Sequence, residues 1–317
     1  MQSDSIENFD KIEDYLYLGS YAIAENINVL NSINIKRVLS INNFQIGNKD
    51  PQILYKWFKI EDRAEEDLLS ILIDCYQFIN DGQERMENIF VHCKAGISRS
   101  GAVITAFIMK KYKYTCNEAL ETVKLKRDIN PNWGFIQQLM VYGEMNCVLN
   151  VMHKPYRRLL FMNILNKWWR IQWLFFSEAP YEKSLCKNFN NFIGKLKNNE
   201  EPNTTCNYNC INCKSVLFEQ MHVIENELNL DKTEDKNFNC NNIYIEPQRW
   251  MYNIFMTLDI KGRLQHGDIN CYFCSKLIGK YNFSKNIPFK CYCCNHSNVA
   301  IYLFIKIFKN KVNYNVS

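Results

Sequence analysis

The sequence lacks the features that would place the chain in a membrane or in the secretory pathway. No run of apolar residues approaches the roughly 18 that a membrane-spanning helix needs. Residues 1–14 are polar and acidic, so we expect no secretory signal, no membrane partner and a reducing compartment. A large excess of one charge is also missing, since 38 basic and 33 acidic side chains give a net charge of +5. This mildly basic balance permits a ribonucleoprotein partner without demanding one.

Cysteine, by contrast, is abundant and concentrated late in the chain. Nine of the fourteen cysteines lie after residue 200. In a reducing compartment such clusters indicate metal binding rather than disulfides. Two C-x-x-C pairs, Cys210/Cys213 and Cys271/Cys274, each offer two thiolates to a tetrahedral zinc ion, which needs four ligands. Three of the five earlier cysteines, at 75, 116 and 147, fit core or surface positions of helical segments.

We therefore predict two structural zinc ions in residues 201–317, each held by one of the pairs. Cys240 and either His222 or Cys206 complete the first site, and Cys291 with either Cys293 or Cys294 completes the second. The cysteine pairs are strong indicators, whereas their spacing leaves the fourth ligand of each site open.

The segment His92–Gly101, HCKAGISRSG, carries the chemistry of the first half of the chain. Cys93 supplies a sulfur nucleophile, and the guanidinium of Arg99 matches two oxygens of a phosphate. Gly96 allows backbone angles that a side chain forbids, so the intervening amides can turn toward an anion. The predicted anion-binding residues are Lys94, Ala95, Gly96, Ile97, Ser98 and Arg99. The alternative, a buried cysteine with an unrelated surface arginine, requires a chance coincidence of four fixed residues.

Strand-like and helix-like segments alternate around this loop. Residues 15–18, 37–41, 54–60 and 88–91 read as strands, and residues 22–33, 68–80, 100–112 and 116–125 read as helices. The alternation predicts an α/β fold. The loop then joins a strand to a helix N-terminus, where anions bind and where a cysteine favours the thiolate.

The motif resembles the signature loop of cysteine-dependent protein phosphatases, and its SRS ending resembles the dual-specificity branch. This resemblance covers about residues 10–145 and implies hydrolysis of phosphoserine, phosphothreonine and phosphotyrosine through a cysteinyl-phosphate, without a catalytic metal. It implies a mixed central sheet flanked by helices. Ile97 stands where phosphoinositide phosphatases commonly have a lysine, which argues against an inositol lipid substrate.

The resemblance also assigns catalytic roles. Asp62, after the strand that ends near residue 60, matches the general acid of dual-specificity phosphatases, with Glu61 as the alternative. Acidic residues also collect near helix N-termini for electrostatic reasons alone. Ser100 is expected to donate a hydrogen bond to the sulfur, and His92 to orient the loop.

The second half resembles one subfamily of these enzymes. Residues 240–251, CNNIYIEPQRWM, match the C-x-x-x-[FY]-I-E-P-x-x-W-M signature of phosphatases with a C-terminal zinc-binding domain. That resemblance implies a small β-rich domain, residence in nucleus and cytoplasm, and a role in maturation of the large ribosomal subunit on pre-60S particles. Catalysis is then either the main task or secondary to assembly.

Three regions are predicted: a phosphatase domain at residues 1–149, a basic and aromatic helical linker at 150–200, and the zinc domain at 201–317. Within the linker, residues 151–176 carry a stripe of apolar side chains with interleaved Lys and Arg. Such a stripe fits a helix docked on its own protein, and alternatively a contact with RNA or another partner.

Overall fold

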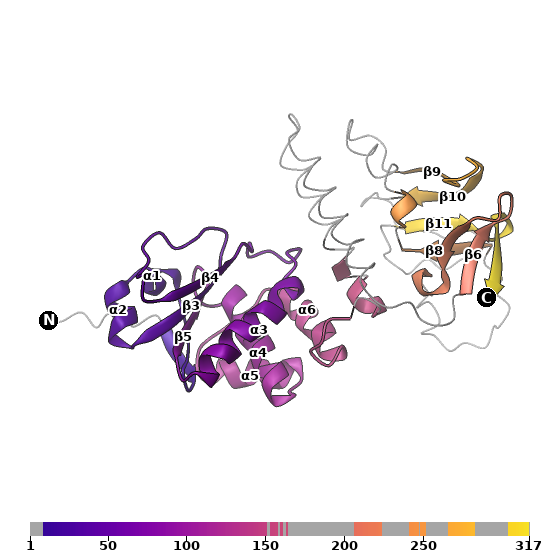
Figure 1. Cartoon of the computed structure of the whole chain (residues 1–317). Helices are drawn as coiled ribbons and strands as arrows, with labels where there is room; N and C mark the ends of the chain where they lie inside the picture. Colours follow the sequence, from indigo (N-terminus) through magenta and orange to yellow (C-terminus); the bar gives the residue numbers. More distant parts are fainter. Residues whose placement is uncertain are drawn as a thin grey trace. The chain divides into compact units, whose positions relative to one another are not determined.

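The computed structural model describes residues 9–150, 153–157, 159–160, 163, 206–223, 241–246, 248–251, 266–282 and 304–316. Contacts divide the chain into two units, Met1–Arg170 and Ile171–Ser317. In Figure 1 the first unit runs from indigo to magenta and the second from orange to yellow.

The first unit is built on a five-stranded mixed sheet with the strand order β1-β2-β5-β3-β4. Its strands are β1 (Phe9–Glu13), β2 (Leu16–Gly19), β3 (Ile35–Ile41), β4 (Leu54–Phe58) and β5 (Asn88–His92). Strand β1 pairs antiparallel with β2, and the other neighbours are parallel. The central strands β3 and β5 are buried along most of their length, as strands covered on both faces are. The mixed sheet expected from the sequence is confirmed.

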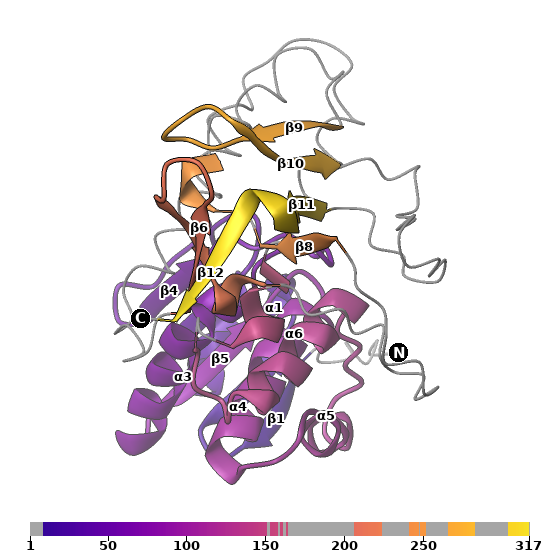
Figure 2. The same cartoon turned by 90° about the vertical axis from the view of Figure 1, so that its right-hand side faces the viewer.

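Helices cover both faces of this sheet. The short helices α1 (Tyr21–Ala24) and α2 (Ile27–Ser32) pack around a core cluster that includes Val38 and Phe90. The longer helices, seen together in Figure 2, are α3 (Leu69–Glu84), α4 (Arg99–Tyr112), α5 (Cys116–Lys124) and α6 (Trp133–Glu144). Helix α4 packs against the other three and is buried from Arg99 to Met109.

One predicted helix is divided in two. The sequence suggested a single helical stretch over residues 22–33, whereas α1 ends at Ala24 and α2 begins at Ile27. Asn26 lies between them in an extended conformation, and its side chain accepts a hydrogen bond from the Val29 backbone N–H at 3.3 Å. Asparagine caps a new helix better than it continues one, which explains the break.

The second unit consists of two antiparallel sheets. The strand orders are β8-β11-β10-β9 and β12-β6-β7. The strands are β6 (Cys206–Cys210), β7 (Val216–Glu219), β8 (Asn242–Ile245), β9 (His266–Asn270), β10 (Leu277–Asn282), β11 (Phe304–Phe308) and β12 (Val312–Val316). A β-rich second half, as the sequence predicted, is confirmed.

The linker predicted for residues 150–200 lies almost entirely outside the described residues. Its described beginning includes Tyr156 and Leu160, which are 1% and 6% exposed. Among the residues that the structure describes, no helix has both the length and the apolar character required to span a membrane.

Candidate active site and metal centre

The loop between β5 and α4 forms the floor of the candidate active site. Strand β5 ends at His92 and helix α4 begins at Arg99, which is the strand–loop–helix order predicted from the sequence. Gly96 has a φ of +73°, and a Cβ there would lie 2.4 Å from the Gly19 carbonyl oxygen. Only glycine fits this turn without displacing β2.

Cys93 lies at the bottom of the loop and is 1% exposed. Its Sγ accepts hydrogen bonds from the Gly96 backbone N–H at 3.3 Å and from the Ser100 hydroxyl at 3.2 Å. Burial alone would raise the pKa of the Cys93 thiol, but the hydrogen bonds from Ser100 and the charge of Arg99 hold this pKa below its ordinary value. The side chain therefore favours the nucleophilic thiolate.

The guanidinium of Arg99 is fixed beside the loop. Its Nη1 donates to Asn42 Oδ1 at 2.9 Å and to the Ile60 carbonyl at 3.2 Å. Its Nε is buried without a hydrogen-bond partner, and the Arg99 side chain is 6% exposed. A buried cationic donor left open in this way suits an anion such as a phosphoryl group.

The other predicted anion-binding residues divide by exposure. Gly96 and Ser98 are buried, whereas the side chains of Lys94, Ala95 and Ile97 are exposed. The Lys94 carbonyl accepts a hydrogen bond from the Tyr21 backbone at 3.0 Å, which ties the outer side of the loop to α1.

The structure brings Asp62 to this loop. Its Oδ1 accepts hydrogen bonds from the Ser98 hydroxyl at 2.6 Å and from Asn132 Nδ2 at 2.8 Å. Its Oδ2 lies 3.8 Å from Arg99 Nε. The alternative acid, Glu61, pairs with Arg63 at 2.8 Å. The two candidate carboxylates thus have different partners, and the described contacts join Asp62 to the phosphate-binding loop.

His92 lies directly before the nucleophile and is fully buried. Its Nε2 lies 2.7 Å from the Ser40 hydroxyl and its Nδ1 lies 3.0 Å from the Cys93 carbonyl. Burial lowers the pKa of His92 to about 4, so the ring is neutral near pH 7. A neutral ring bonded on both sides ties the backbone of Cys93 to β3 through Ser40.

Three further residues form hydrogen bonds to the site, although they were not predicted from the sequence. Asn42 follows β3 and accepts a hydrogen bond from Arg99. Because β3 lies beside β5 and parallel to it, the residue after β3 is expected near the loop after β5, and this placement could have identified Asn42. Arg127 donates to the Gly96 carbonyl at 2.8 Å and to the Ala95 carbonyl at 3.2 Å. Asn132 lies in the segment NPNWGF, residues 130–135, whose sequence does not reveal the contact of Asn132 with Asp62.

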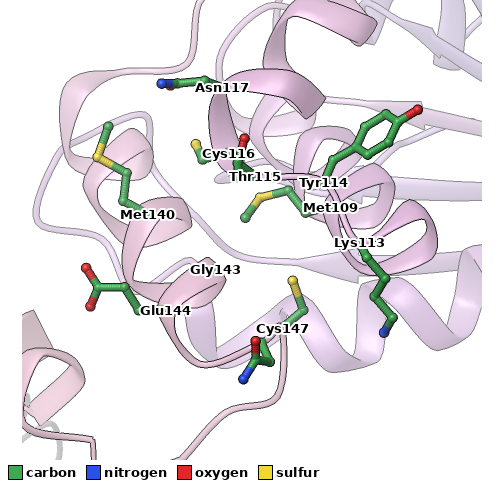
Figure 3. A pocket seen from close by; sticks show the side chains of 11 residues that line it. Met109, Lys113, Tyr114, Thr115, Cys116, Asn117, Met140, Gly143, Glu144 and Cys147 are labelled. Carbon is green, nitrogen blue, oxygen red and sulfur yellow. The ribbon is translucent and has the colours of Figure 1, made fainter.

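A separate concavity lies at the far end of α4 from Arg99. It measures about 630 Å³ and is lined from α4, α5 and α6. Figure 3 shows Met109, Cys116, Met140 and Cys147 around it. Because α4 carries Arg99 at its N-terminus and Met109 near its C-terminus, this pocket is not part of the phosphate-binding loop.

The candidate metal centre is formed by four cysteines of the second unit. Cys210, Cys213, Cys271 and Cys274 place their sulfur atoms within 4.8 Å of one another. The Sγ–Sγ distances are 3.7 Å for Cys210–Cys274 and for Cys213–Cys271. Four sulfurs about 2.3 Å from one tetrahedral zinc would lie about 3.8 Å apart, so this donor set fits a structural zinc ion.

Both cysteine pairs have the same backbone conformation. The residues after the second cysteines, Lys214 and Ser275, have φ angles of 64° and 58°. The Lys214 and Ser275 N–H groups donate to the carbonyls of Cys210 and Cys271, each at 2.9 Å. Backbone hydrogen bonding from Lys276 holds the pKa of Cys274 below its ordinary value, which favours the thiolate that zinc binds. We call these two turns, residues 210–215 and 271–276, the knuckles.

The predicted division of the knuckles between two zinc ions is wrong, because the structure brings both pairs to one centre. Each knuckle was expected to combine with cysteines that follow it in sequence. Instead the β6–β7 and β9–β10 hairpins lie side by side, although their cysteines are about 60 residues apart (Figures 1 and 2).

Of the other predicted ligands, the structure describes His222 and Cys206, and neither is in this cluster. His222 accepts a hydrogen bond at Nδ1 from the Glu219 backbone at 3.1 Å, and Cys206 begins β6, where it pairs with Val316. Three predicted ligands and one alternative, Cys240, Cys291, Cys293 and Cys294, lie outside the described residues. A second zinc ion therefore stays a prediction.

Comparison with known proteins follows the same division of the chain. Residues 16–145 match the family model of the dual specificity phosphatase catalytic domain. The chain is 34% identical to dual specificity protein phosphatase 1B of Arabidopsis thaliana, over 43% of this chain and 82% of that protein. It is 26% identical to the tyrosine-protein phosphatase yvh1 of Schizosaccharomyces pombe, over 88% of this chain and 79% of that protein.

Among solved structures, the yvh1 phosphatase domain of Chaetomium thermophilum is 25% identical, with a TM-score of 0.42 over 45% of this chain and 99% of that one. The similarity to yvh1 of S. pombe extends well past the catalytic region into the half that carries the four-cysteine cluster. The chain belongs to the dual-specificity protein phosphatases, in the subfamily that joins this catalytic domain to a C-terminal zinc-binding domain.

Proposed function

We propose that this phosphatase hydrolyses phosphoserine, phosphothreonine and phosphotyrosine in proteins through a cysteinyl-phosphate on Cys93. The observation that supports it best is the meeting of three groups at one loop. A thiolate-favouring Cys93 and the open Nε of Arg99, from the loop after β5 and the start of α4, meet the carboxylate of Asp62, which comes from the loop after β4. These are the nucleophile, the anion clamp and the acid that phosphoryl transfer to sulfur needs.

In the first step the Cys93 thiolate attacks phosphorus and the bond to the seryl, threonyl or tyrosyl oxygen breaks. Arg99 and the amides of residues 94–99 hold the nonbridging oxygens, whose charge they balance. Asp62, entering in its protonated form, gives its proton to the departing oxygen. The products are the free hydroxyl group and the phosphorylated cysteine.

In the second step the Asp62 carboxylate takes a proton from water as that water attacks phosphorus. The phosphorus–sulfur bond breaks and inorganic phosphate leaves, which regenerates the thiolate. The Ser100 hydroxyl, 3.2 Å from Sγ, donates a hydrogen bond to the departing sulfur. No step requires a metal ion or cofactor at this site.

The test is hydrolysis of an aryl phosphate and of phosphopeptides by Cys93→Ser. Turnover should fall by more than a thousandfold, while phosphopeptide affinity stays close to that of the parent because Arg99 and the loop amides are unchanged. Cys75→Ser, which alters a buried cysteine of α3, is the matched control. Activity of Cys93→Ser within about tenfold of the parent, a loss of only ~1.4 kcal/mol, would exclude Cys93 as the nucleophile.

For the second unit we propose docking on pre-60S ribosomal particles, in nucleus and cytoplasm, with two structural zinc ions. The similarity to yvh1 over 88% of this chain and the zinc-compatible cluster support this role. Catalysis would then be either the main task or secondary to large-subunit assembly. Rescue of cells that lack the protein separates these cases: Cys93→Ser rescues growth if docking is the essential task, and Cys271→Ser rescues it if catalysis is.

A further inference from the structure

The metal centre presents an exposed surface that neither zinc binding nor catalysis uses. Ile211, Tyr272 and Phe273 lie between the cysteines of the two knuckles and are 44%, 62% and 58% exposed. Large apolar side chains grouped at one place on a surface usually mark a binding site. The zinc ligands hold the backbone of both turns, so these side chains stand on a rigid support.

The side chains of the two knuckles belong to one surface. Each is within two residues of a cysteine in a cluster whose sulfurs lie within 4.8 Å of one another. Cys210 Sγ lies 3.7 Å from Cys274 Sγ, and Cys213 Sγ lies 3.7 Å from Cys271 Sγ, so the two knuckles are in direct contact. In Figures 1 and 2 the turns of the β6–β7 and β9–β10 hairpins accordingly lie side by side.

Basic side chains surround these apolar residues. Lys214 and Lys276 are exposed within the knuckles. Lys311 is exposed beside the first knuckle, where its carbonyl accepts a hydrogen bond from the Ile211 backbone at 3.0 Å. The two knuckles contain no acidic residue. We define the knuckle surface as Ile211, Lys214, Tyr272, Phe273, Lys276 and Lys311.

The geometry of the aromatic pair adds to this chemistry. The rings of Tyr272 and Phe273 have centroids 5.5 Å apart and an interplanar angle of 86°. An edge-to-face pair uses one face of one ring, so other faces remain available for stacking. Flat faces next to lysines suit a ligand with planar groups on an anionic backbone.

We propose that the knuckle surface binds a single-stranded segment of RNA. Tyr272 and Phe273 stack on bases, and Lys214, Lys276 and Lys311 contact the phosphates. This inference rests on the proposed docking of the second unit on pre-60S particles and names the component that it contacts. An acidic protein segment would satisfy the lysines but would leave the open aromatic faces without a planar partner.

The experiment measures binding of the zinc-loaded full chain to a labelled single-stranded RNA of mixed sequence, by fluorescence anisotropy. Tyr272→Ala combined with Phe273→Ala should weaken binding about tenfold or more, since loss of one stacking ring typically weakens binding about five- to hundredfold. Tyr314→Ala is the matched control, because Tyr314 is an aromatic residue of the same unit that is 49% exposed outside the knuckles. Zinc content is measured for each variant.

A second variant tests the charges without touching residues between the ligands. Changing Lys214, Lys276 and Lys311 to Gln should reduce the dependence of log K on log salt by up to about 2, at roughly 0.7 for each lost phosphate contact on a single strand. Lys280→Gln, which alters a lysine paired with Asp268 at 3.3 Å, is its control. The inference is wrong if both variants keep zinc and bind RNA like their controls.

Sedimentation with purified pre-60S particles separates this inference from the docking on which it rests. A parent chain that sediments with particles, while the RNA oligonucleotide fails to bind and an acidic peptide competes, would overturn the RNA assignment and leave docking intact. A parent chain that binds RNA through the knuckle surface but never sediments with particles would support the inference and refute the docking.

Discussion

The thiol of Cys93 is subject to opposing influences. Burial disfavours its charged form, whereas hydrogen bonds from Ser100 and Gly96 and the positive charge of Arg99 favour it. The favourable contacts prevail, since the pKa of the Cys93 thiol lies below its ordinary value. The enzyme should consequently form its thiolate at a lower pH than an ordinary cysteine does.

Ser100→Ala should raise the pH at which Cys93 becomes reactive. The change removes a donor 3.2 Å from Sγ, and a hydrogen bond to a charged group contributes about 1.5–3 kcal/mol, which corresponds to an upward shift of one to two pH units. The measurement is the rate of iodoacetamide alkylation of Cys93 against pH. Thr105→Val is the control, because Thr105 also has a buried hydroxyl on α4 but donates it to the Gly101 carbonyl. Equal midpoints for the two variants would contradict the role of Ser100.

At the scale of elements, Asp62, the proposed general acid, is placed by contacts between segments. The loop after β4 carries Asp62, the signature loop contributes Ser98, and the residue before α6 contributes Asn132. Ser98 also accepts a hydrogen bond from the Asn132 backbone at 3.1 Å. Three loops are thereby joined around one carboxylate.

Asp62→Ala should slow hydrolysis of substrates with poor leaving groups by about 10²–10⁴, the usual contribution of a general acid. An aryl phosphate with a strongly acidic phenol should be affected less in the phosphorylation step, because that leaving group departs without a proton. The measurement compares kcat/KM for the two substrates, because kcat/KM reports the phosphorylation step whereas kcat also includes hydrolysis of the phosphocysteine. Glu61→Ala is the matched control, since the Glu61 carboxylate pairs with Arg63. If Glu61→Ala shows the leaving-group dependence and Asp62→Ala does not, the acid is Glu61.

The sequence was sufficient to predict helices and strands that depend on neighbouring residues. It was not sufficient to predict contacts between residues that are far apart in the chain. The strand, loop and helix around Cys93 depend on neighbouring residues, and the structure has them as the sequence indicated. Arg127 was missed because it lies 31 residues after Gly96, and no periodicity links the two. Asn26 carried a local signal, a helix-capping side chain, which the apolar pattern of residues 22–33 obscured.

The same reasoning explains the error in the metal centre. A C-x-x-C pair in the sequence predicts two ligands of a metal site, but the identity of the other two ligands depends on how the hairpins pack in three dimensions. Strand β11 pairs with β10, strand β12 pairs with β6, and only Lys309–Lys311 separates β11 from β12. The two hairpins are thereby brought together, although their cysteines are about 60 residues apart. Sequence order favoured nearby partners such as Cys240, whereas the antiparallel sheets bring the two knuckles together.

At the scale of the whole molecule, we expect the two units to depend on metal to different extents. The first unit has a sheet covered by helices on both faces and a continuous apolar core. The second unit has small antiparallel sheets joined at the four-cysteine cluster. Structural zinc contributes on the order of 10 kcal/mol to such small domains, more than their packing supplies alone.

Chelation should accordingly unfold the second unit while the first keeps its structure and activity. The measurements are elemental analysis of the reduced protein, hydrogen exchange of β6–β12, and aryl phosphate hydrolysis before and after chelation. Cys271→Ser should lose zinc and protection in the second unit, whereas Cys116→Ser, in the catalytic unit, should lose neither. Less than one zinc ion per chain, with β6–β12 still protected from exchange, would show that packing alone holds the second unit. Loss of hydrolysis on chelation would contradict the independence of the phosphate-binding loop from metal.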